Sequence, residues 1–324
     1  MRVAITGGTG FVGGHLAVAL AKEGHQVVAI ARGMDQRPWS SQVLGTAGVT
    51  DVQASLTDLN ALRQAFAGCD AVAHCAGINR ELGSQTYGAV HVGGTRNVVD
   101  AAQQAGVQRI VLLSFLRARP DCGSAYHETK WAAEEIVRAT RLEWTVLKPG
   151  IIFGRGDHML DHLVRALCTF PVFISMGRRL VRPVAIGDVV RILTAALIRG
   201  RLAKKTSPVT GPTELLFDDA VRLIGRVIGK QPVLVRLPFA ATYTVAWSAE
   251  RLMTVPLISQ SQVRILEEEV VDPVLAPDLL PTDLVPRTAF DRLSVEAGLP
   301  ERTGFRLGDL RLFAKRVRAG SART

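Results

Sequence analysis

The first sixteen residues carry the feature that most constrains what this chain can fold into. Arg2 to Thr6 is a short apolar run with β-branched residues, which is typical of a buried parallel strand. Glycines follow at positions 7, 8, 10 and 13, and Leu16 to Leu20 then continues at helical spacing. A strand, a glycine-rich turn and a helix in this order favour a site for the pyrophosphate of a dinucleotide over a plain glycine-rich turn.

The chemistry of such a site explains the glycines. One allows the tight turn, one lets backbone amides approach the pyrophosphate, and Gly13 lets the helix pack closely on the strand. The start of the helix offers free N–H groups and a partial positive charge to the phosphates. The predicted cofactor contacts in this stretch are Gly7, Thr9, Gly10, Phe11, Val12 and Gly13.

Apolar runs and amphipathic segments alternate along the first half of the chain. Strands are expected at 26–31, 49–54, 70–75, 107–114 and 145–148, and helices lie between them, one capped by Thr57 and one over 85–104. This rhythm predicts an α/β fold, a Rossmann-type doubly wound parallel sheet with right-handed crossovers.

Beyond Gly150 the pattern loosens. Short strands are expected at 172–176 and 182–186, and helices at 157–170, 188–198, 217–228, 239–253 and 260–269. We therefore expect residues 1–150 to form the dinucleotide-binding domain, completed by 183–200. Residues 151–324 would mainly form a smaller substrate lobe, over the carboxyl ends of the strands, and a basic C-terminal tail.

The end of the second predicted strand indicates which dinucleotide binds. An acidic residue there would hydrogen-bond the ribose of NAD, whereas a cation accommodates the 2′-phosphate of NADP. No carboxylate lies between Gln26 and Gly33, and the residue at the end of the strand is a cation, Arg32. Electrostatics favour NADP(H), with Arg37 as a second contact, and NAD(H) is the alternative if Arg32 is only a solvated strand end.

The charge pattern and the cysteines indicate which binding partners and which compartment to expect. The formal net charge is +10, but the arginines are scattered and no basic run is interleaved with aromatic residues, so nucleic acid is not expected. The four cysteines show no metal-ligand spacing and are interpreted as reduced thiols of a cytoplasmic protein. Contact of the C-terminal tail with an anionic membrane stays open, as does a homodimer. The basic residues of this tail are Arg311, Lys315, Arg316, Arg318 and Arg323.

One predicted helix carries a phenol and an ammonium group close together. Tyr126 and Lys130 are four residues apart, so they share a helix face. A tyrosine has a pKa near ~10 and becomes a usable base only when a nearby positive charge stabilises its phenolate. The alternative interpretation is that Tyr126 and Lys130 are an ordinary pair of side chains on the surface of the helix. The position after the fifth strand, where a nicotinamide would arrive, favours general acid/base chemistry.

Several motifs together resemble the extended short-chain dehydrogenases/reductases, the NAD-dependent epimerase/dehydratase family. The likeness covers nearly the whole chain and is closest to the branch that contains the dinucleotide-binding accessory subunit of respiratory complex I. The motifs are the glycine-rich turn of residues 6–13, His74-Cys-Ala-Gly77, His91-Val-Gly-Gly-Thr-Arg-Asn97, Tyr126-x-x-x-Lys130, Lys148-Pro-Gly-Ile-Ile-Phe-Gly154 and Arg182-Pro-Val-Ala-Ile-Gly-Asp188.

The resemblance implies a role for each matching residue. Gly7, Gly10 and Gly13 would cradle the pyrophosphate, and Ala76 and Gly77 would flank the ribose. Tyr126 would be the acid/base, and Lys130 would bind the nicotinamide ribose and lower the tyrosine pKa. Pro149 and Gly150 would shape the nicotinamide pocket, and Ser114 is the candidate for the family's catalytic hydroxyl.

The chain departs from the family pattern at three positions. Leu116 stands where the catalytic serine or threonine usually lies, which leaves Ser114 and Ser124 as alternatives. His91 replaces an asparagine, and Ser55 replaces an acidic residue. The resemblance implies an NAD(P)-dependent oxidoreductase or epimerase/dehydratase acting on a small-molecule hydroxyl or carbonyl. The alternative is a non-catalytic dinucleotide-binding protein that serves in assembly or redox sensing.

Overall fold

The chain forms two compact units in the computed structural model, which describes residues 1–33, 45–81, 83–175, 177–252, 260–300 and 304. Unit 1 comprises residues 1–152, 183–212 and 272–289, and unit 2 comprises 153–182, 213–271 and 290–324. Arg37 and the basic C-terminal tail lie outside the described residues. No helix in the described part of the chain has both the length and the apolar character needed to span a bilayer.

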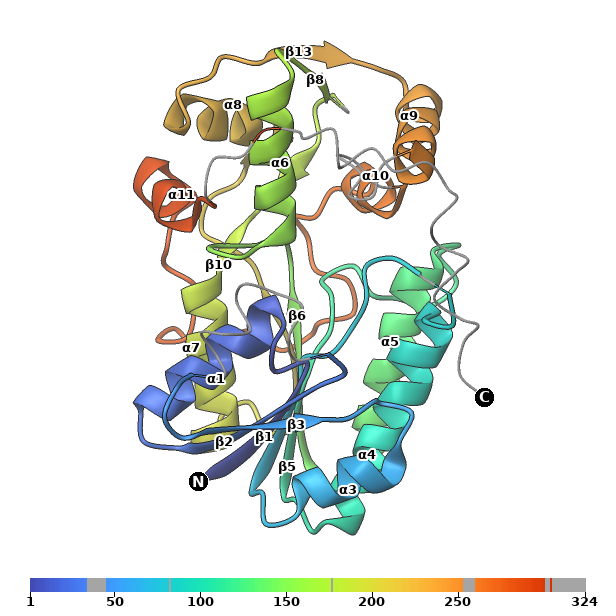
Figure 1. Ribbon diagram of the computed structural model, residues 1–324, viewed down its shortest axis with the longest axis vertical. Helices are drawn as coiled ribbons and strands as arrows, with labels where there is room; N and C mark the ends of the chain where they lie inside the picture. Colours follow the sequence, from blue (N-terminus) through green and yellow to red (C-terminus); the bar gives the residue numbers. More distant parts are fainter. Residues whose placement is uncertain (34–44, 82, 176, 253–259, 301–303, 305–324) are drawn as a thin grey trace, which may run out of the picture. The chain divides into compact units, whose positions relative to one another are not determined.

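Unit 1 is built on one seven-stranded sheet in which all neighbouring strands are parallel (Figure 1). Its strands are β1 (Arg2–Thr6), β2 (Gln26–Ala31), β3 (Val49–Gln53), β4 (Ala71–His74), β5 (Arg109–Leu113), β6 (Glu143–Pro149) and β11 (Lys205–Val209). The order is β11-β6-β5-β4-β1-β2-β3, so the direction of winding reverses between β1 and β4. This arrangement confirms the predicted doubly wound parallel sheet, whose ligands bind beyond the carboxyl ends of the strands at that reversal.

Helices cover both faces of the sheet (Figure 1). One face packs against α1 (Phe11–Lys22) and α7 (Ile186–Arg199), with Leu16, Leu20 and Ile192 fully buried. The other face packs against α3 (Leu59–Phe66), α4 (Gly94–Gln104) and α5 (Ala125–Arg138). The central strands are buried on both sides, which explains their continuous apolar runs.

One expected helix cap was wrong, and two expected elements are present but differ in detail. Asp58, not Thr57, caps α3, because its carboxylate accepts the Ala61 amide at 2.9 Å. The helix expected over 85–104 begins with a π-helical segment, η1 (Gly88–Gly93), before α4. The strand expected at 182–186 is shorter, because α7 already begins at Ile186.

The chain leaves unit 1 through β7 (Ile152–Phe153) and returns through β10 (Val184–Ala185). Unit 2 pairs β8 (Val172–Ser175) with β13 (Val233–Arg236) in parallel, and β9 (Leu180–Val181) with β12 (Leu215–Leu216) antiparallel. Its helices are α6 (His158–Thr169), α8 (Phe217–Val227), α9 (Phe239–Leu252), α10 (Gln260–Glu267) and α11 (Arg292–Gly298).

Candidate functional site

The glycine-rich turn lies where β1, β2 and β4 end. The amides of Gly7 and Gly8 both donate to the Ile30 carbonyl, at 2.9 and 3.1 Å. Gly7 has a φ of +72°, and a Cβ there would lie 2.9 Å from the Cα of Ala76. A Cβ at Gly13 would lie 2.3 Å from the Gly7 carbonyl oxygen. Any side chain at either position would therefore push the turn away from the helix or from the chain after β4.

The start of α1 has the properties of an anion site. Its N-cap is Gly10, which has no side chain to occupy the first amides, and the first turn contains no acidic residue. Thr9 and Val12 are buried, and Phe11 is half-buried with its carbonyl accepting from Nδ1 of His15 at 2.8 Å. Because the first amides of a helix have no acceptor within the helix, the start of α1 can offer them to an anionic group, and the residues present fit a pyrophosphate.

Arg32 directly follows β2, the strand next to the glycine-rich turn. Its side chain is exposed, and its carbonyl accepts from the Gln53 amide nitrogen at 2.9 Å. A contact of Arg32 with the 2′-phosphate of NADP stays a prediction.

A second turn, Cys75 to Ile78, follows β4. It contains Ala76 and Gly77, which are predicted to flank the ribose, and it contacts Lys130, which is predicted to bind the ribose. A Cβ at Gly77 would lie 3.1 Å from Nζ of Lys130 and 3.6 Å from Nε2 of His91. The structure therefore brings Gly77 and Lys130 together, as it does Gly7 and Ala76. Burial raises the pKa of the Cys75 thiol to about 12, against the influence of Lys130, so this cysteine stays protonated.

Helix α5 carries the predicted acid/base pair. Nζ of Lys130 donates to the Leu113 carbonyl at the end of β5, at 3.3 Å. Burial lowers the pKa of Lys130 to about 8, and the carboxylate of Glu134, one turn further along the helix, partly opposes this.

The phenol of Tyr126 lies among aromatic rings and faces the chain after β4. Its hydroxyl donates to Oδ1 of Asn79 at 3.4 Å, and its ring meets those of Phe115 and Tyr87 edge-on at 5.5 and 5.6 Å. Burial, and secondarily the phenol of Tyr87, raise the pKa of Tyr126 above its ordinary value. Tyr126 therefore holds its proton at neutral pH in the protein without cofactor.

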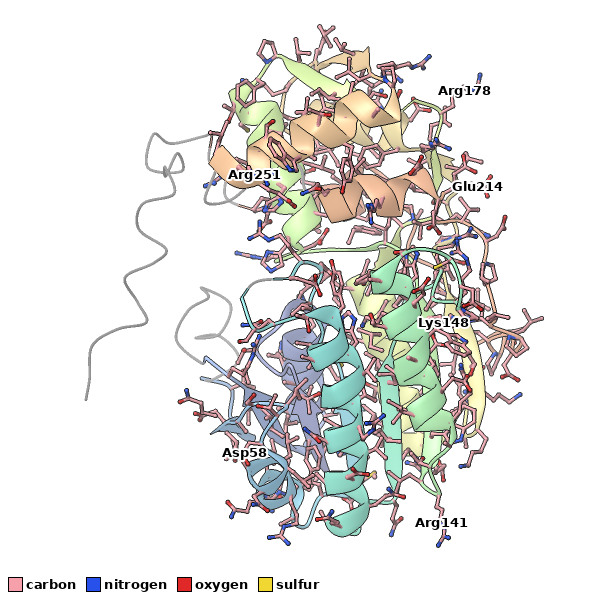
Figure 2. All side chains as sticks on the ribbon, turned by 90° about the vertical axis from the view of Figure 1, so that its right-hand side faces the viewer. Asp58, Arg141, Lys148, Arg178, Glu214 and Arg251 are labelled. Carbon is pink, nitrogen blue, oxygen red and sulfur yellow. The ribbon has the colours of Figure 1, made fainter. Side chains whose placement is uncertain are left out.

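Ser114, the predicted catalytic hydroxyl, belongs to a buried charge network. Its hydroxyl donates to Glu134, whose carboxylate also lies 3.2 Å from Nζ of Lys148, the residue labelled in Figure 2, and 3.1 Å from Arg138. Glu134 and Lys148 are fully buried, and Lys148 also donates to the Ala118 carbonyl at 2.8 Å. The contacts of Ser114 are thus those of a residue that joins β5 to α5, and its catalytic role stays a prediction.

The chain around Leu116 and Pro149 is held by backbone bonds. Leu116 is fully buried, and its amide donates to the Pro149 carbonyl at 2.8 Å. The amide of Gly150 donates to the Val209 carbonyl at 3.0 Å, which ties the predicted nicotinamide-pocket residues to β11. Ser124, the alternative hydroxyl, is the half-buried N-cap of α5.

The sequence did not single out two residues that the structure places beside this site. Asn79 meets the tyrosine hydroxyl, and Glu134 lies one turn from Lys130. A buried acid on the inward face of α5 could have been suspected from its position four residues after Lys130. Within the described residues, no group of three or more histidine, cysteine, aspartate or glutamate side chains could hold a metal ion.

Similarity to known proteins shows which family the chain belongs to. A family profile described as NAD(P)H-binding matches residues 7–158. The ceramide reductase of Caulobacter vibrioides is 30% identical over 262 residues, which are 76% of this chain and 78% of that protein. The chain belongs to the extended short-chain dehydrogenase/reductase family. This membership means that the site binds a nicotinamide dinucleotide.

Other similar proteins share part of their length or only the fold with this chain. An uncharacterized Mycobacterium tuberculosis protein is 30% identical over 82% of this chain, which spans only 27% of the length of that relative. The mouse mitochondrial NADH dehydrogenase [ubiquinone] 1 alpha subcomplex subunit 9 is 25% identical over 86% of this chain and 73% of its own length. UDP-glucuronic acid 4-epimerase from Bacillus cereus, solved with NAD, shares the fold with a TM-score of 0.64 at 18% identity, covering 74% of this chain and 88% of its own.

Proposed function

We propose that the protein is an NAD(P)-dependent oxidoreductase or epimerase/dehydratase acting on a small-molecule hydroxyl or carbonyl, with Tyr126 as its acid/base. The observation that carries this proposal is the meeting of Lys130 with Gly77, one helical turn from Tyr126 and next to the glycine-rich turn. A cofactor on the glycine-rich turn that reached this point would bring its nicotinamide ribose beside the acid/base.

The direction that suits the free protein is reduction. The bound cofactor supplies hydride exchange with a substrate carbon. The phenol of Tyr126 carries a proton at neutral pH, as a tyrosine with its ordinary pKa of ~10 also does, and it can donate that proton to the oxygen of a carbonyl. The ammonium group of Lys130 then stabilises the phenolate that is left. In the oxidative direction Tyr126 takes the proton from the alcohol.

The first test is a substrate screen. Purified protein with NADPH or NADH would be mixed with ketones and aldehydes that include steroid, ceramide-type and quinone compounds, and oxidation of the cofactor would be followed by absorbance. Sugar nucleotides would be incubated with NAD and their products analysed for isomers, because an epimerase leaves the cofactor unchanged overall. Turnover in either assay supports the proposal, and none in both, with cofactor bound, contradicts it.

We further propose that NADPH binds more tightly than NADH, since Arg32 stands at the exposed end of β2. Replacing Arg32 with alanine removes a charge-assisted contact with the 2′-phosphate, so NADPH affinity should fall about tenfold to hundredfold while NADH affinity stays nearly constant. Fluorescence titration of both cofactors measures this, with Arg63→Ala on α3 as the control. Equal affinities for NADPH and NADH in the unaltered protein would overturn the proposal.

A second candidate function is dinucleotide binding without turnover. Two observations favour it: the hydroxyl of Ser114 is held by Glu134, and Leu116 occupies the family's usual hydroxyl position. The similarity to a subunit of NADH dehydrogenase also fits an assembly or redox-sensing role. Under this alternative, Tyr126→Phe would change nothing, and only substitutions in the glycine-rich turn, such as Gly10→Val, would abolish cofactor binding.

A further inference from the structure

His91 is a buried residue whose two ring nitrogens contact two different segments of unit 1. It lies on η1 and is only 2% exposed. Nε2 accepts the backbone amide of Ile78, in the turn after β4, at 3.3 Å. Nδ1 lies 3.0 Å from the hydroxyl of Thr129, which is on α5 between Tyr126 and Lys130.

The hydrogen bonds assign one protonation state to this ring. Because Nε2 accepts from the Ile78 amide, the single proton of a neutral imidazole is on Nδ1 and points to Thr129. The Thr129 hydroxyl can accept this bond because its own proton is donated to the Ala125 carbonyl at 2.6 Å. Burial and the nearby charge of Lys130 hold the pKa of His91 at about 2, so the ring stays neutral and Nε2 stays an acceptor.

Aromatic contacts fix the plane of the ring. Tyr87 stacks on His91 at 5.5 Å with 22° between the planes, and Tyr126 meets it edge-on at 5.6 Å. The hydroxyl of Tyr87 also donates to the Asn79 carbonyl at 3.0 Å. Two side chains thus hold the segment from Gly77 to Asn79: His91 of η1 accepts from the Ile78 amide, and Tyr87, just before η1, donates to the Asn79 carbonyl.

We infer that His91 is a positioning residue that fastens the ribose turn of residues 76–78 to the helix that carries Tyr126 and Lys130. The inference rests on the proposed function, because it assigns this turn to the nicotinamide ribose. His91 touches no reacting atom. Through its contact with the Ile78 amide, it sets the distance between the ribose turn and the acid/base, Tyr126.

Three substitutions separate the two contacts of the ring. Glutamine places a carbonyl oxygen near the position of Nε2 and can still accept from Ile78. Asparagine reaches only the position of Nδ1 and retains the contact with Thr129. Phenylalanine keeps the ring and the stack on Tyr87 but removes both nitrogens.

Hydrogen exchange of the Ile78 amide and titration of NADH and NADPH form the test. In His91→Asn and His91→Phe, we expect exchange at Ile78 to speed up and both dissociation constants to rise by about threefold to tenfold. In His91→Gln, both should stay within about twofold of the unaltered protein. Thermal melts of all variants report general loss of stability, and His91→Gln and His91→Asn decide the question if His91→Phe does not fold.

Two results would overturn the inference: unchanged exchange at Ile78 in His91→Asn, or glutamine and asparagine variants that lose cofactor affinity equally. Neither readout needs turnover. A protein that binds NADPH, responds to His91→Asn as expected and turns over neither the carbonyl compounds nor the sugar nucleotides would defeat the proposed function and leave the role of His91 standing.

Discussion

Lys130 shows how one residue can couple cofactor binding to pH. Burial lowers its pKa to about 8, so its ammonium group is largely charged below that pH and loses its proton above it. Because the charged group is the one that would hold the cofactor's ribose and favour a phenolate, we expect cofactor affinity to weaken as the pH rises through about 8.

Titration of NADH from about pH 6 to about pH 10 measures this dependence, in a range that spans the lowered pKa of a lysine. The Lys130→Met variant should bind more weakly at every pH and lose the step near pH 8. A step of unchanged size in Lys130→Met would assign the titration to another group.

Ser114 has the contacts of a stabilising residue. Its hydroxyl donates to Glu134, which is fully buried and also accepts from Lys148 and Arg138. Ser114→Ala leaves this carboxylate with one donor fewer, so we expect a loss of about 1–3 kcal/mol in the free energy of unfolding. Turnover per folded molecule should change little.

Denaturant unfolding and steady-state rates on the same preparation separate these effects. Ser124→Ala is the matched control, because Ser124 makes no capping hydrogen bond at the start of α5. A Ser114→Ala protein of unchanged stability that no longer turns over would restore Ser114 as the catalytic hydroxyl.

The sequence predicts helices, strands and turns best where the residues that specify them are close together in the chain. The glycine-rich turn, α1 and α5 are found because glycine spacing and helical periodicity lie within a few residues of one another. β11 was not predicted, because Lys205-Thr-Ser-Pro-Val209 is a mostly polar run with a proline in it. It is an edge strand that pairs with β6 alone, and an edge tolerates such a sequence.

The residues of the candidate site also divide into those that a local sequence pattern reveals and those that it does not. Tyr126 and Lys130 are visible in the sequence because their spacing is helical. The contact of His91 with Ile78, and that of Ser114 with Glu134, depend on how η1 and α5 are placed after folding. No periodicity records such contacts, so the sequence predicts the chemical groups of the site and misses what orients them.

The start of α3 offers a quantitative test at the scale of one element. Asp58 caps this helix through the Ala61 amide, whereas the hydroxyl of the adjacent Thr57 bonds to Ser55 at 2.8 Å (Figure 2 labels Asp58). Asp58→Ala should therefore lower the free energy of unfolding by about 0.5–2 kcal/mol. Thr57→Ala is the matched control and should cost less. A larger loss for Thr57→Ala in denaturant titrations would mean that the cap has been misassigned.

At the scale of the whole molecule, unit 1 is assembled from three separate stretches of the chain. Residues 183–212 supply α7 and β11, and residues 272–289 bind back to them: the amides of Arg287 and Thr288 donate to Asp188, and the amide of Thr206 donates to Asp278. The dinucleotide-binding fold is therefore completed by two segments that lie on either side of residues 213–271 of unit 2 in the sequence.

The glycine-rich turn, the ribose turn and α5 belong to this one unit, so the proposed proton transfer would depend on the same sheet as the binding of cofactor. Family membership accounts for the binding. The central claim of the account is the further step, that Tyr126 moves a proton while hydride is exchanged.

Transfer of deuterium from the reduced cofactor to a product tests that claim most directly. Protein with NADPH deuterated at the transferable position would be incubated with the carbonyl panel, and mass spectrometry would show any alcohol that carries deuterium. We predict labelled alcohol from the unaltered protein, formed ~10²–10⁴-fold more slowly by Tyr126→Phe, with nearly unchanged NADPH affinity. Equal rates in the two proteins would contradict it, and so would an unaltered protein that binds NADPH but forms neither labelled alcohol nor, with NAD, isomers of the sugar nucleotides.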